Sequence, residues 1–244
     1  MFEIPTVKIE LYHQDRARFA QQLGQALEHV GVAQVNRVRQ DLVDQLYKKA
    51  EEVFDECAPF RAGLGDPGYY AENTSMKNIG YITREVLAIK FLRDFPKFRQ
   101  EAEQFQRGLQ VIAQRVLNAL SMYLETEVFT VIDDPNLVFF RYPVLSAETK
   151  ERIQKQDHFE YGKPLLLNPH EDDENIILFP TATQPGLEGL IGEEWVPLNP
   201  EPGHCLIIPG KGLYQQIRRI KPLKHQVSIP PNSVLPRLAM GLGF

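Results

Sequence analysis

A histidine and a carboxylate stand two residues apart at His170 and Asp172, just ahead of the apolar run 176–179. On an extended backbone, residues i and i+2 point to the same side, so an imidazole nitrogen and a carboxylate oxygen can reach one metal ion together. The best candidate for a third ligand is His225, which opens a second β-branched segment. Two histidines and one carboxylate bind one face of a metal and leave the opposite face open, which is the ligand set of non-haem Fe(II) oxygenases.

The surroundings of these residues carry the prediction, because His-x-Asp alone is a weak pattern that arises by chance. A similar pair, His158 and Glu160, follows a stretch typical of a solvated loop or helix end, and we favour no metal role for it. A single histidine is more often a hydrogen-bonded surface or core residue than a ligand. The chain between Asp172 and His225 leaves room for several short strands, which a small barrel needs to bring two distant strands face to face.

Composition and charge exclude several classes of protein. The 244 residues are 43% hydrophobic and predict a large unit with a substantial core, and the net charge of −5 offers no basic surface for nucleic acid. No apolar run approaches the ~20 residues that a membrane span needs, and the first residues lack a secretory signal. Cys57 and Cys205 fit no metal or redox spacing. We expect a cytoplasmic protein without a nucleic-acid or membrane partner, as a monomer or a homodimer.

Helical periodicity dominates the first half of the chain. Apolar positions at helical spacing predict one helix after Asp15, a second after Asp41 and a long third helix that Pro96 opens. Residues 58–90 contain several glycines and are expected to be irregular. We therefore predict an α-rich lobe over residues 1–132.

Short apolar runs separated by glycine and proline turns dominate the second half. They predict a strand at 137–142 and several further strands, one of them at 214–220. Many short strands with such turns are typical of a two-sheet sandwich or barrel, and a jelly roll fits best because it places a ligand site between its sheets. The expected fold class is α+β with a mainly β core, in which the lobe packs on a jelly-roll catalytic core over 133–244 as one compact unit.

Six segments in order along the chain carry a family resemblance. They are residues 26–35, 140–143, 170–172, 193–203, 225–227 and 237–239. The segment at 140–143 is similar to an Asn-Tyr-Tyr-Pro strand, the one at 225–227 to His-Arg-Val, and the one at 237–239 to Arg-x-Ser. In this order they resemble the isopenicillin-N-synthase-like Fe(II)- and 2-oxoglutarate-dependent dioxygenases, whose core is a double-stranded β-helix, or jelly roll.

The resemblance implies roles for individual residues. His170, Asp172 and His225 would hold Fe(II). Arg237 would bind the distal carboxylate of the cosubstrate 2-oxoglutarate, and Tyr142 would donate a hydrogen bond to it. The reaction would consume O2, hydroxylate or desaturate a small-molecule substrate, and release succinate and CO2. Candidate substrate-pocket residues are Tyr69, Tyr70, Tyr81, Arg84, Lys163 and Tyr214, a mixture that suggests a small acid, an amino acid or an aromatic metabolite.

Two departures from the family pattern leave alternatives open. Ala239 replaces the family's serine beside the carboxylate, and Phe140 stands in place of an asparagine. Losing one buried charge-assisted hydrogen bond, worth roughly 1.5–3 kcal/mol, weakens 2-oxoglutarate binding about tenfold or more. The alternatives are a catalytically degenerate metal- or ligand-binding member, an Fe(II) oxidase that does not use 2-oxoglutarate, and a cupin-like isomerase or hydrolase with another divalent metal. The sequence does not identify the substrate.

Overall fold

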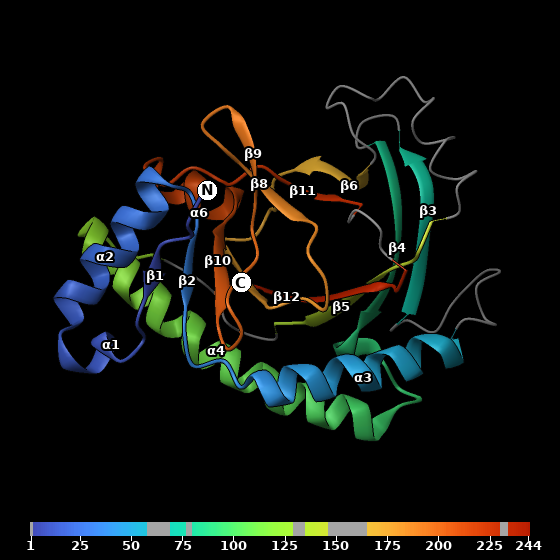
Figure 1. The fold of residues 1–244 in the computed structure, drawn as a ribbon. Coiled ribbons are helices and arrows are strands. Elements are labelled where there is room, and N and C mark those ends of the chain that lie inside the picture. Colours follow the sequence, from blue (N-terminus) through green and yellow to red (C-terminus); the bar gives the residue numbers. More distant parts are fainter. Residues whose placement is uncertain (1, 58–68, 77–79, 129–134, 146–164, 230–233) are drawn as a thin grey trace.

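The structure is a computed structural model that describes residues 2–57, 69–76, 80–128, 135–145, 165–229 and 234–244 (Figure 1). At 69–76, 80–83 and 91 only the backbone is described. The elements are β1 (Thr6–Val7), α1 (Leu11–Gln14), α2 (Arg16–His29), β2 (Ala33–Val35), α3 (Gln40–Cys57), β3 (Tyr69–Met76), β4 (Gly80–Ala88), the 3-10 helix η2 (Ile89–Phe91), α4 (Pro96–Leu124), β5 (Leu137–Tyr142), β6 (Leu165–His170), β7 (Ile176–Pro180), β8 (Leu187–Ile191), β9 (Glu194–Pro197), β10 (Cys205–Pro209), α6 (Lys211–Ile217), β11 (His225–Ser228) and β12 (Arg237–Gly243).

The described strands form two sheets in a mixed α/β fold with a large β core. The larger sheet has eight strands in the order β1-β2-β10-β7-β12-β5-β4-β3, and the smaller has four in the order β6-β11-β8-β9. Strands from the first 132 residues, β1 to β4, are therefore hydrogen-bonded into the same sheet as β5, β7, β10 and β12. Figure 1 shows α3 and α4 along one side of the large sheet and the small sheet on its other side.

Alternation along the strands divides the apolar side chains between two clusters. On β5 and β12, Phe139 and Met240 belong to the cluster that includes the helices, whereas Tyr142 and Ala239 belong to the cluster between the sheets. Successive side chains of a strand point to opposite faces, so each strand contributes to both clusters. Fully burying a side chain the size of Phe139 contributes roughly 1.5–3 kcal/mol, which holds the helices on the sheet. The second cluster encloses the space that contains the site.

The helices begin and pack as their sequences predict. The Asp15 carboxylate accepts a hydrogen bond from the Arg18 backbone N–H (3.0 Å) and caps α2. The residue Gly31, which follows this helix, has φ +88°, a conformation that glycine adopts without strain. A Cβ at Gly24 would lie 2.1 Å from Cγ of Tyr123, so α2 and α4 approach closely only because this residue is glycine. The predictions of a helix after Asp15 and of a long helix from Pro96 are confirmed.

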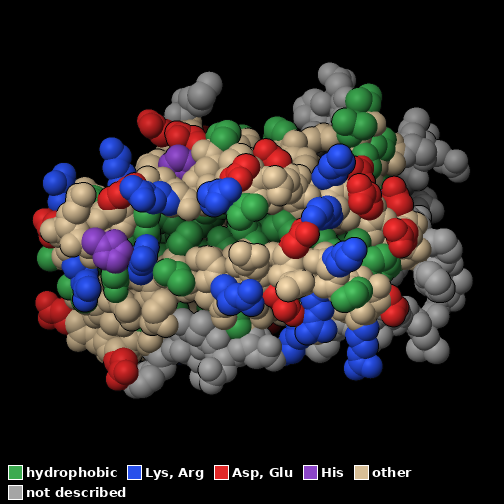
Figure 2. Space-filling model, turned by 90° about the horizontal axis from the view of Figure 1, so that it is seen from below, with side chains coloured by type: hydrophobic (Ala, Val, Ile, Leu, Met, Phe, Trp, Pro, Cys, Tyr) green, Lys and Arg blue, Asp and Glu red, His purple; other side chains and the backbone are tan. Residues whose placement is uncertain are grey.

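The helical side of the molecule also carries a groove. It lies between α4 and the segment 37–42, has a volume of about 440 Å³, and is lined by apolar side chains together with Arg37, Arg39 and Arg115. Figure 2 views the molecule from this side and shows hydrophobic side chains gathered in a hollow near its centre, between charged side chains of both signs. None of the helices in the described parts of the chain is long and apolar enough to cross a membrane.

Two expectations about secondary structure were wrong. Residues 58–90 are not wholly irregular, because β3 and β4 pair antiparallel from Tyr69 opposite Leu87 to Met76 opposite Gly80 and extend the large sheet from β5. Residues 211–217 form the helix α6, where a strand at 214–220 was expected. The Lys211 N–H donates to the Asp172 carbonyl (2.8 Å), so contacts with a distant loop support this helix start. The pairing of β4 with β5 and the hydrogen bond at the start of α6 both join distant parts of the chain, so local periodicity predicts neither of them.

Candidate metal centre

The structure brings the three predicted ligands together. His170 ends β6, Asp172 lies two residues later in the following loop, and His225 begins β11. The strands β6 and β11 pair antiparallel with His170 directly opposite His225, and the two imidazole centroids are 4.3 Å apart. The second histidine therefore comes from the neighbouring strand of the same sheet. The apolar run that follows Asp172 forms β7 in the other sheet, so the loop carrying Asp172 crosses between the two sheets.

The donor atoms have the spacing of ligands around one ion. His170 Nε2 lies 3.5 Å from Asp172 Oδ1, and His225 Nε2 lies 3.4 Å from Asp172 Oδ2. One ligand atom from each residue can be chosen so that all lie within 4.8 Å of one another. Atoms about 2.1 Å from a common metal are about 3.0 Å apart at a right angle and about 3.4 Å apart at a tetrahedral angle. The triad fits a divalent metal with little movement.

Backbone carbonyls orient both imidazoles. Nδ1 of His170 is 2.9 Å from the Asn168 carbonyl, and Nδ1 of His225 is 3.0 Å from the Leu223 carbonyl. A carbonyl oxygen only accepts hydrogen bonds, so each Nδ1 carries a proton, and in the neutral imidazole Nε2 is then the nitrogen that can bind a metal. Such contacts fix the tautomer and the ring orientation of a metal ligand.

The carboxylate of Asp172 also fits a cation. Its Oδ2 is buried and has no hydrogen-bond partner among the described residues. A buried, unpartnered carboxylate oxygen is costly unless a cation satisfies it. The surrounding loop is held in place, because the N–H groups of Lys211 and Gly212 donate to the carbonyls of Asp172 (2.8 Å) and Asp173 (3.0 Å).

Electrostatics favour the protonation states that bind metal. Burial opposes the ionisation of Asp172, but the neighbouring groups of His170, His225 and Arg84 favour the ionised form and outweigh burial, so the pKa of this carboxyl lies below its ordinary value. Burial lowers the pKa of His225, although the charge of Asp172 opposes this effect. An ionised carboxylate and a neutral imidazole are the forms that coordinate a metal.

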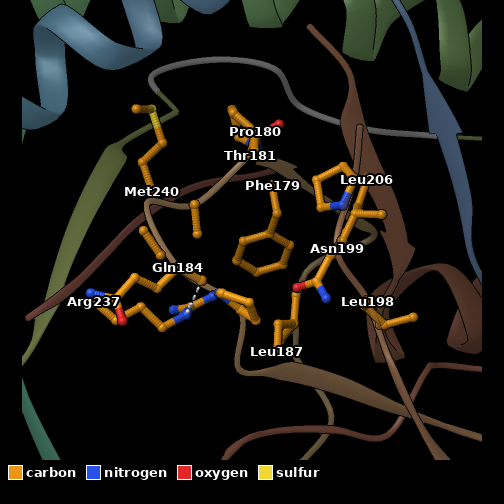
Figure 3. Close-up of a pocket in the computed structure, with 14 residues that line it drawn as sticks. Phe179, Pro180, Thr181, Gln184, Leu187, Leu198, Asn199, Leu206, Arg237 and Met240 are labelled. Carbon is orange, nitrogen blue, oxygen red and sulfur yellow. Dashed lines mark hydrogen bonds between the residues drawn. The ribbon is translucent and has the colours of Figure 1, made fainter. Parts of the chain in front are cut away.

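A cavity between the sheets lies near the triad, although none of the three candidate ligands lines it. It has a volume of about 160 Å³, and its lining includes Phe179, Leu187, Leu206, Arg237 and Ala239. Figure 3 shows the Phe179 ring pointing into this space with Arg237 on one side and Leu206 on the other. The centroid of the Phe179 ring lies 6.2 Å from that of the His225 ring, so this phenyl ring stands between the cavity and the candidate ligands. The volume suits a small molecule.

Arg237 is a buried cation without a counter-charge in the described part of the chain. Its exposed fraction is 5%, its Nε donates to the Gln184 carbonyl (3.1 Å), and its guanidinium carbon lies 5.3 Å from the centre of the Tyr142 ring. Burial lowers the pKa of this guanidinium, while the nearby hydroxyls of Tyr142 and Tyr47 oppose the shift. Buried guanidinium groups are normally paired, so this arrangement suits an anion in the cavity. Ala239 lines the same cavity and offers it no hydroxyl.

The sequence reasoning missed the loop that positions Arg237. Thr183 in this loop donates its N–H to the Leu238 carbonyl (2.9 Å) and accepts the Leu238 N–H at its Oγ1 (2.8 Å). Gly186 has φ +140°, and a Cβ there would lie 3.3 Å from Cδ and Nε of Arg237. The Pro185-Gly186 pair indicates a turn, but nothing in the sequence connects that turn with β12.

The structure describes the side chains of only some of the remaining candidate residues. Arg84 lies on β4 with its guanidinium carbon 5.0 Å from the centre of the Phe140 ring. Tyr214 lies on α6, where its ring packs against Arg218 (5.2 Å). His158, Glu160 and Lys163 lie outside the described residues, as do the side chains of Tyr69, Tyr70 and Tyr81.

Comparisons with known proteins support the fold. No family model matches the chain, and no curated protein matches it. A structure described as a 2OG-Fe(II) oxygenase family protein from Caulobacter crescentus aligns with a TM-score of 0.78 and 24% identity over 100% of this chain and 87% of that one. A full-length Neurospora crassa protein in complex with alpha-KG aligns with a TM-score of 0.80 and 14% identity over 98% and 84%. The dioxygenase for auxin oxidation 1 from Arabidopsis thaliana, in complex with 2-oxoglutarate, gives 0.68 and 17% over 99% and 92%. The chain has the fold of these proteins.

Proposed function

We propose that this protein is a non-haem Fe(II)- and 2-oxoglutarate-dependent oxygenase that hydroxylates or desaturates a small-molecule substrate and releases succinate and CO2. The observation that carries the proposal is the convergence of His170, Asp172 and His225, one aromatic ring away from a cavity that the buried cation Arg237 lines. The alpha-KG and 2-oxoglutarate bound in structures of the same fold support the choice of cosubstrate. The complex of the Neurospora crassa protein with thymine supports a small substrate.

The chain's own residues have distinct tasks in this proposal. His170, Asp172 and His225 hold Fe(II), which together with 2-oxoglutarate and O2 supplies the oxidising chemistry. Arg237 binds the distal carboxylate of 2-oxoglutarate, and Tyr142 donates a hydrogen bond to the same cosubstrate. Apolar side chains such as those of Phe179, Leu187 and Leu206 keep water out of the cavity, which strengthens the charge interactions within it.

We also propose an architecture for the site. The two facing sheets form a double-stranded β-helix, or jelly roll, whose core is residues 133–244. The helices of residues 1–132 form a lobe that packs on the outer face of the larger sheet. The site lies between the sheets, where that lobe does not obstruct it.

The decisive experiment measures metal binding and cosubstrate turnover separately. Protein offered Fe(II) without O2 should bind about one ion per chain, and adding 2-oxoglutarate with O2 should release succinate even without a primary substrate. Asp172→Ala and His225→Ala should abolish both. Asp173→Ala is a matched control, because this neighbouring carboxylate is 89% exposed in its side chain and pairs with Lys211. His204→Ala is the corresponding histidine control, since that half-buried ring lies near the exposed Glu201 and is not part of the triad.

The outcomes separate the proposed function from its alternatives. Metal binding without succinate release in any assay would indicate a degenerate member of the fold, an outcome in line with the missing hydroxyl at Ala239. Oxygen uptake with substrate but without succinate would indicate an oxidase that does not use 2-oxoglutarate. Full Fe(II) content and activity in Asp172→Ala would refute the site.

A further inference from the structure

The groove between α4 and the segment 37–42 plays no part in the proposed function. It lies on the helical side of the large sheet, whereas the triad lies on the side of the small sheet. Its volume of about 440 Å³ is within the range of sites for small molecules and cofactors, roughly 300–1,000 Å³. The residues of α4 that line it run from Gln104 to Arg115, which is roughly 16 Å of helix. The groove is therefore long enough for an extended small molecule.

The lining of this groove is apolar and open to solvent. Phe105, Leu109 and Ile112 contribute buried side chains, and Val111 is 51% exposed. A Cβ built on Gly108 would have no atom of the described residues within 4 Å. Glycine is less favourable than alanine at an exposed position inside a helix, so the fold gains no stability from this choice. Gly108 instead keeps the groove open where a larger side chain would narrow it.

The charge around the groove is positive. Residues 104–124 of α4 contain two arginines and no acidic residue, although the chain has a net charge of −5. Of the three arginines that line the groove, Arg37 and Arg39 are ion-paired with carboxylates beside them. Arg115 is half-buried, with its guanidinium carbon 5.7 Å from the centre of the Tyr12 ring, and it forms no ion pair with a described residue. A guanidinium over a ring directs its N–H groups outward from its edges, where a carboxylate can accept them.

We propose that this groove binds an unbranched aliphatic carboxylate, with the carboxylate at Arg115 and the chain along α4 past Gly108. The apolar lining removes the chain from water, and Arg115 matches a single negative charge. A second copy of this protein is a poorer occupant, because the same face of α4 would bring arginines together without an acidic partner. This ligand site is separate from the metal centre, so the proposal does not depend on the proposed function.

Titration with matched aliphatic compounds tests the proposal. Metal-free protein without 2-oxoglutarate is titrated calorimetrically with hexanoate, octanoate and decanoate below their micelle concentrations, and with the neutral octanamide. Wild-type protein should bind octanoate about fivefold more tightly than octanamide, because Arg115 is half-buried and favours the anion. Its affinity should rise about tenfold from hexanoate to decanoate, because the added methylene groups leave water.

Variants on α4 separate the contributions of shape and charge. Gly108→Leu fills the groove and should weaken octanoate binding about tenfold or more, whereas Gly108→Ala should stay within about threefold of wild type. Gln110→Leu is the control for an added leucine, because a residue two positions later points about 200° around the helix. Arg115→Gln should reduce the preference for octanoate over octanamide to about twofold or less. Arg107→Gln should leave that preference unchanged, because Arg107 is exposed on α4 outside the groove.

The outcomes at this groove are separable from those at the metal centre. The proposal is overturned if wild type binds octanoate no more tightly than octanamide, or if folded Gly108→Leu binds octanoate as well as wild type does. Arg115→Gln decides the question if Gly108→Leu does not fold. Binding that His225→Ala abolishes would place the acid at the metal centre and overturn the proposal. Binding to phosphatidylglycerol vesicles but not to free octanoate would indicate a membrane surface and overturn it as well. Failure to bind Fe(II) or to release succinate contradicts the proposed function alone.

Discussion

Replacing Arg237 separates its contribution to ligand binding from its contribution to stability. Its Nε already donates to the Gln184 carbonyl, which leaves the two terminal nitrogens for the carboxylate of 2-oxoglutarate. Two charge-assisted hydrogen bonds at roughly 1.5–3 kcal/mol each give about 3–6 kcal/mol. Arg237→Met, which keeps an apolar side chain of similar reach, should therefore weaken 2-oxoglutarate binding by about 10²–10⁴-fold. Arg237→Lys should lose less, because an ammonium keeps the charge but not the paired geometry.

The stability of the ligand-free protein should rise or stay the same in Arg237→Met, whereas its affinity for 2-oxoglutarate falls. The guanidinium is buried without a carboxylate partner in the described part of the chain, so burying it is unfavourable in the ligand-free protein. Arg237→Met should keep or raise the thermal unfolding midpoint of the ligand-free protein. The gain in that midpoint on adding 2-oxoglutarate, which reflects binding to the folded state, should shrink or vanish.

The assay is calorimetric titration of 2-oxoglutarate into Fe(II)-loaded protein without O2, together with thermal unfolding of the ligand-free forms. Arg93→Met serves as a control because Arg93 is exposed on the surface. An affinity for 2-oxoglutarate within about threefold of wild type in Arg237→Met would refute the reasoning, since one hydrogen bond of this kind already exceeds that margin. A lower unfolding midpoint would show that Arg237 is a structural cation.

Local geometry gives three further predictions. Gly186→Ala should lower the free energy of unfolding, measured by urea denaturation, by about 1–3 kcal/mol and should weaken 2-oxoglutarate binding, because this residue has φ +140° and its Cβ would crowd Arg237. An unchanged affinity for 2-oxoglutarate would contradict the role of this loop. Burial raises the pKa of the Cys205 thiol to about 12, so at about pH 8 its thiolate is about 10³-fold scarcer than that of an ordinary cysteine. Mass spectrometry should therefore detect iodoacetamide labelling of Cys205 only after unfolding, and rapid labelling of the native protein would contradict this prediction. A backbone hydrogen bond and the Arg37 guanidinium lower the pKa of Glu10 to about 2, so the Glu10 carboxylate stabilises the folded protein above about pH 4.5 and loses this effect as the pH falls toward 2. The thermal unfolding midpoints of wild type and Glu10→Gln should converge over that pH range, and a constant difference between them would contradict the prediction.

Part of the site could be predicted from the sequence because the information is local. The spacing of His170 and Asp172 allows one segment to present both ligand types, and the structure places their donor atoms 3.5 Å apart. The helix α2 and the long helix α4 follow from apolar periodicity and from the positions of Asp15 and Pro96. In each case the deciding interactions occur within a few residues along the chain.

Other features depend on contacts between distant residues. The strands β3 and β4 belong to the large sheet because β4 pairs with β5, and β5 lies far along the chain. The helix α6 begins where carbonyls of the Asp172 loop accept its first N–H groups. Local pattern shows neither partner, so periodicity alone suggested an irregular segment in one case and a strand in the other.

The sequence by itself determined which residue types are available for a metal and for an anion, namely His170, Asp172, His225 and Arg237. The tertiary structure decided how they meet. The register of β6 against β11 sets His170 opposite His225, and the turn at Gly186 leaves room for Arg237 beside the cavity. Strand register depends on pairing across the whole sheet, and a shift by one residue would turn every side chain of a strand to the opposite face. Short-range pattern therefore supplies the ligands, whereas long-range hydrogen bonding supplies their geometry.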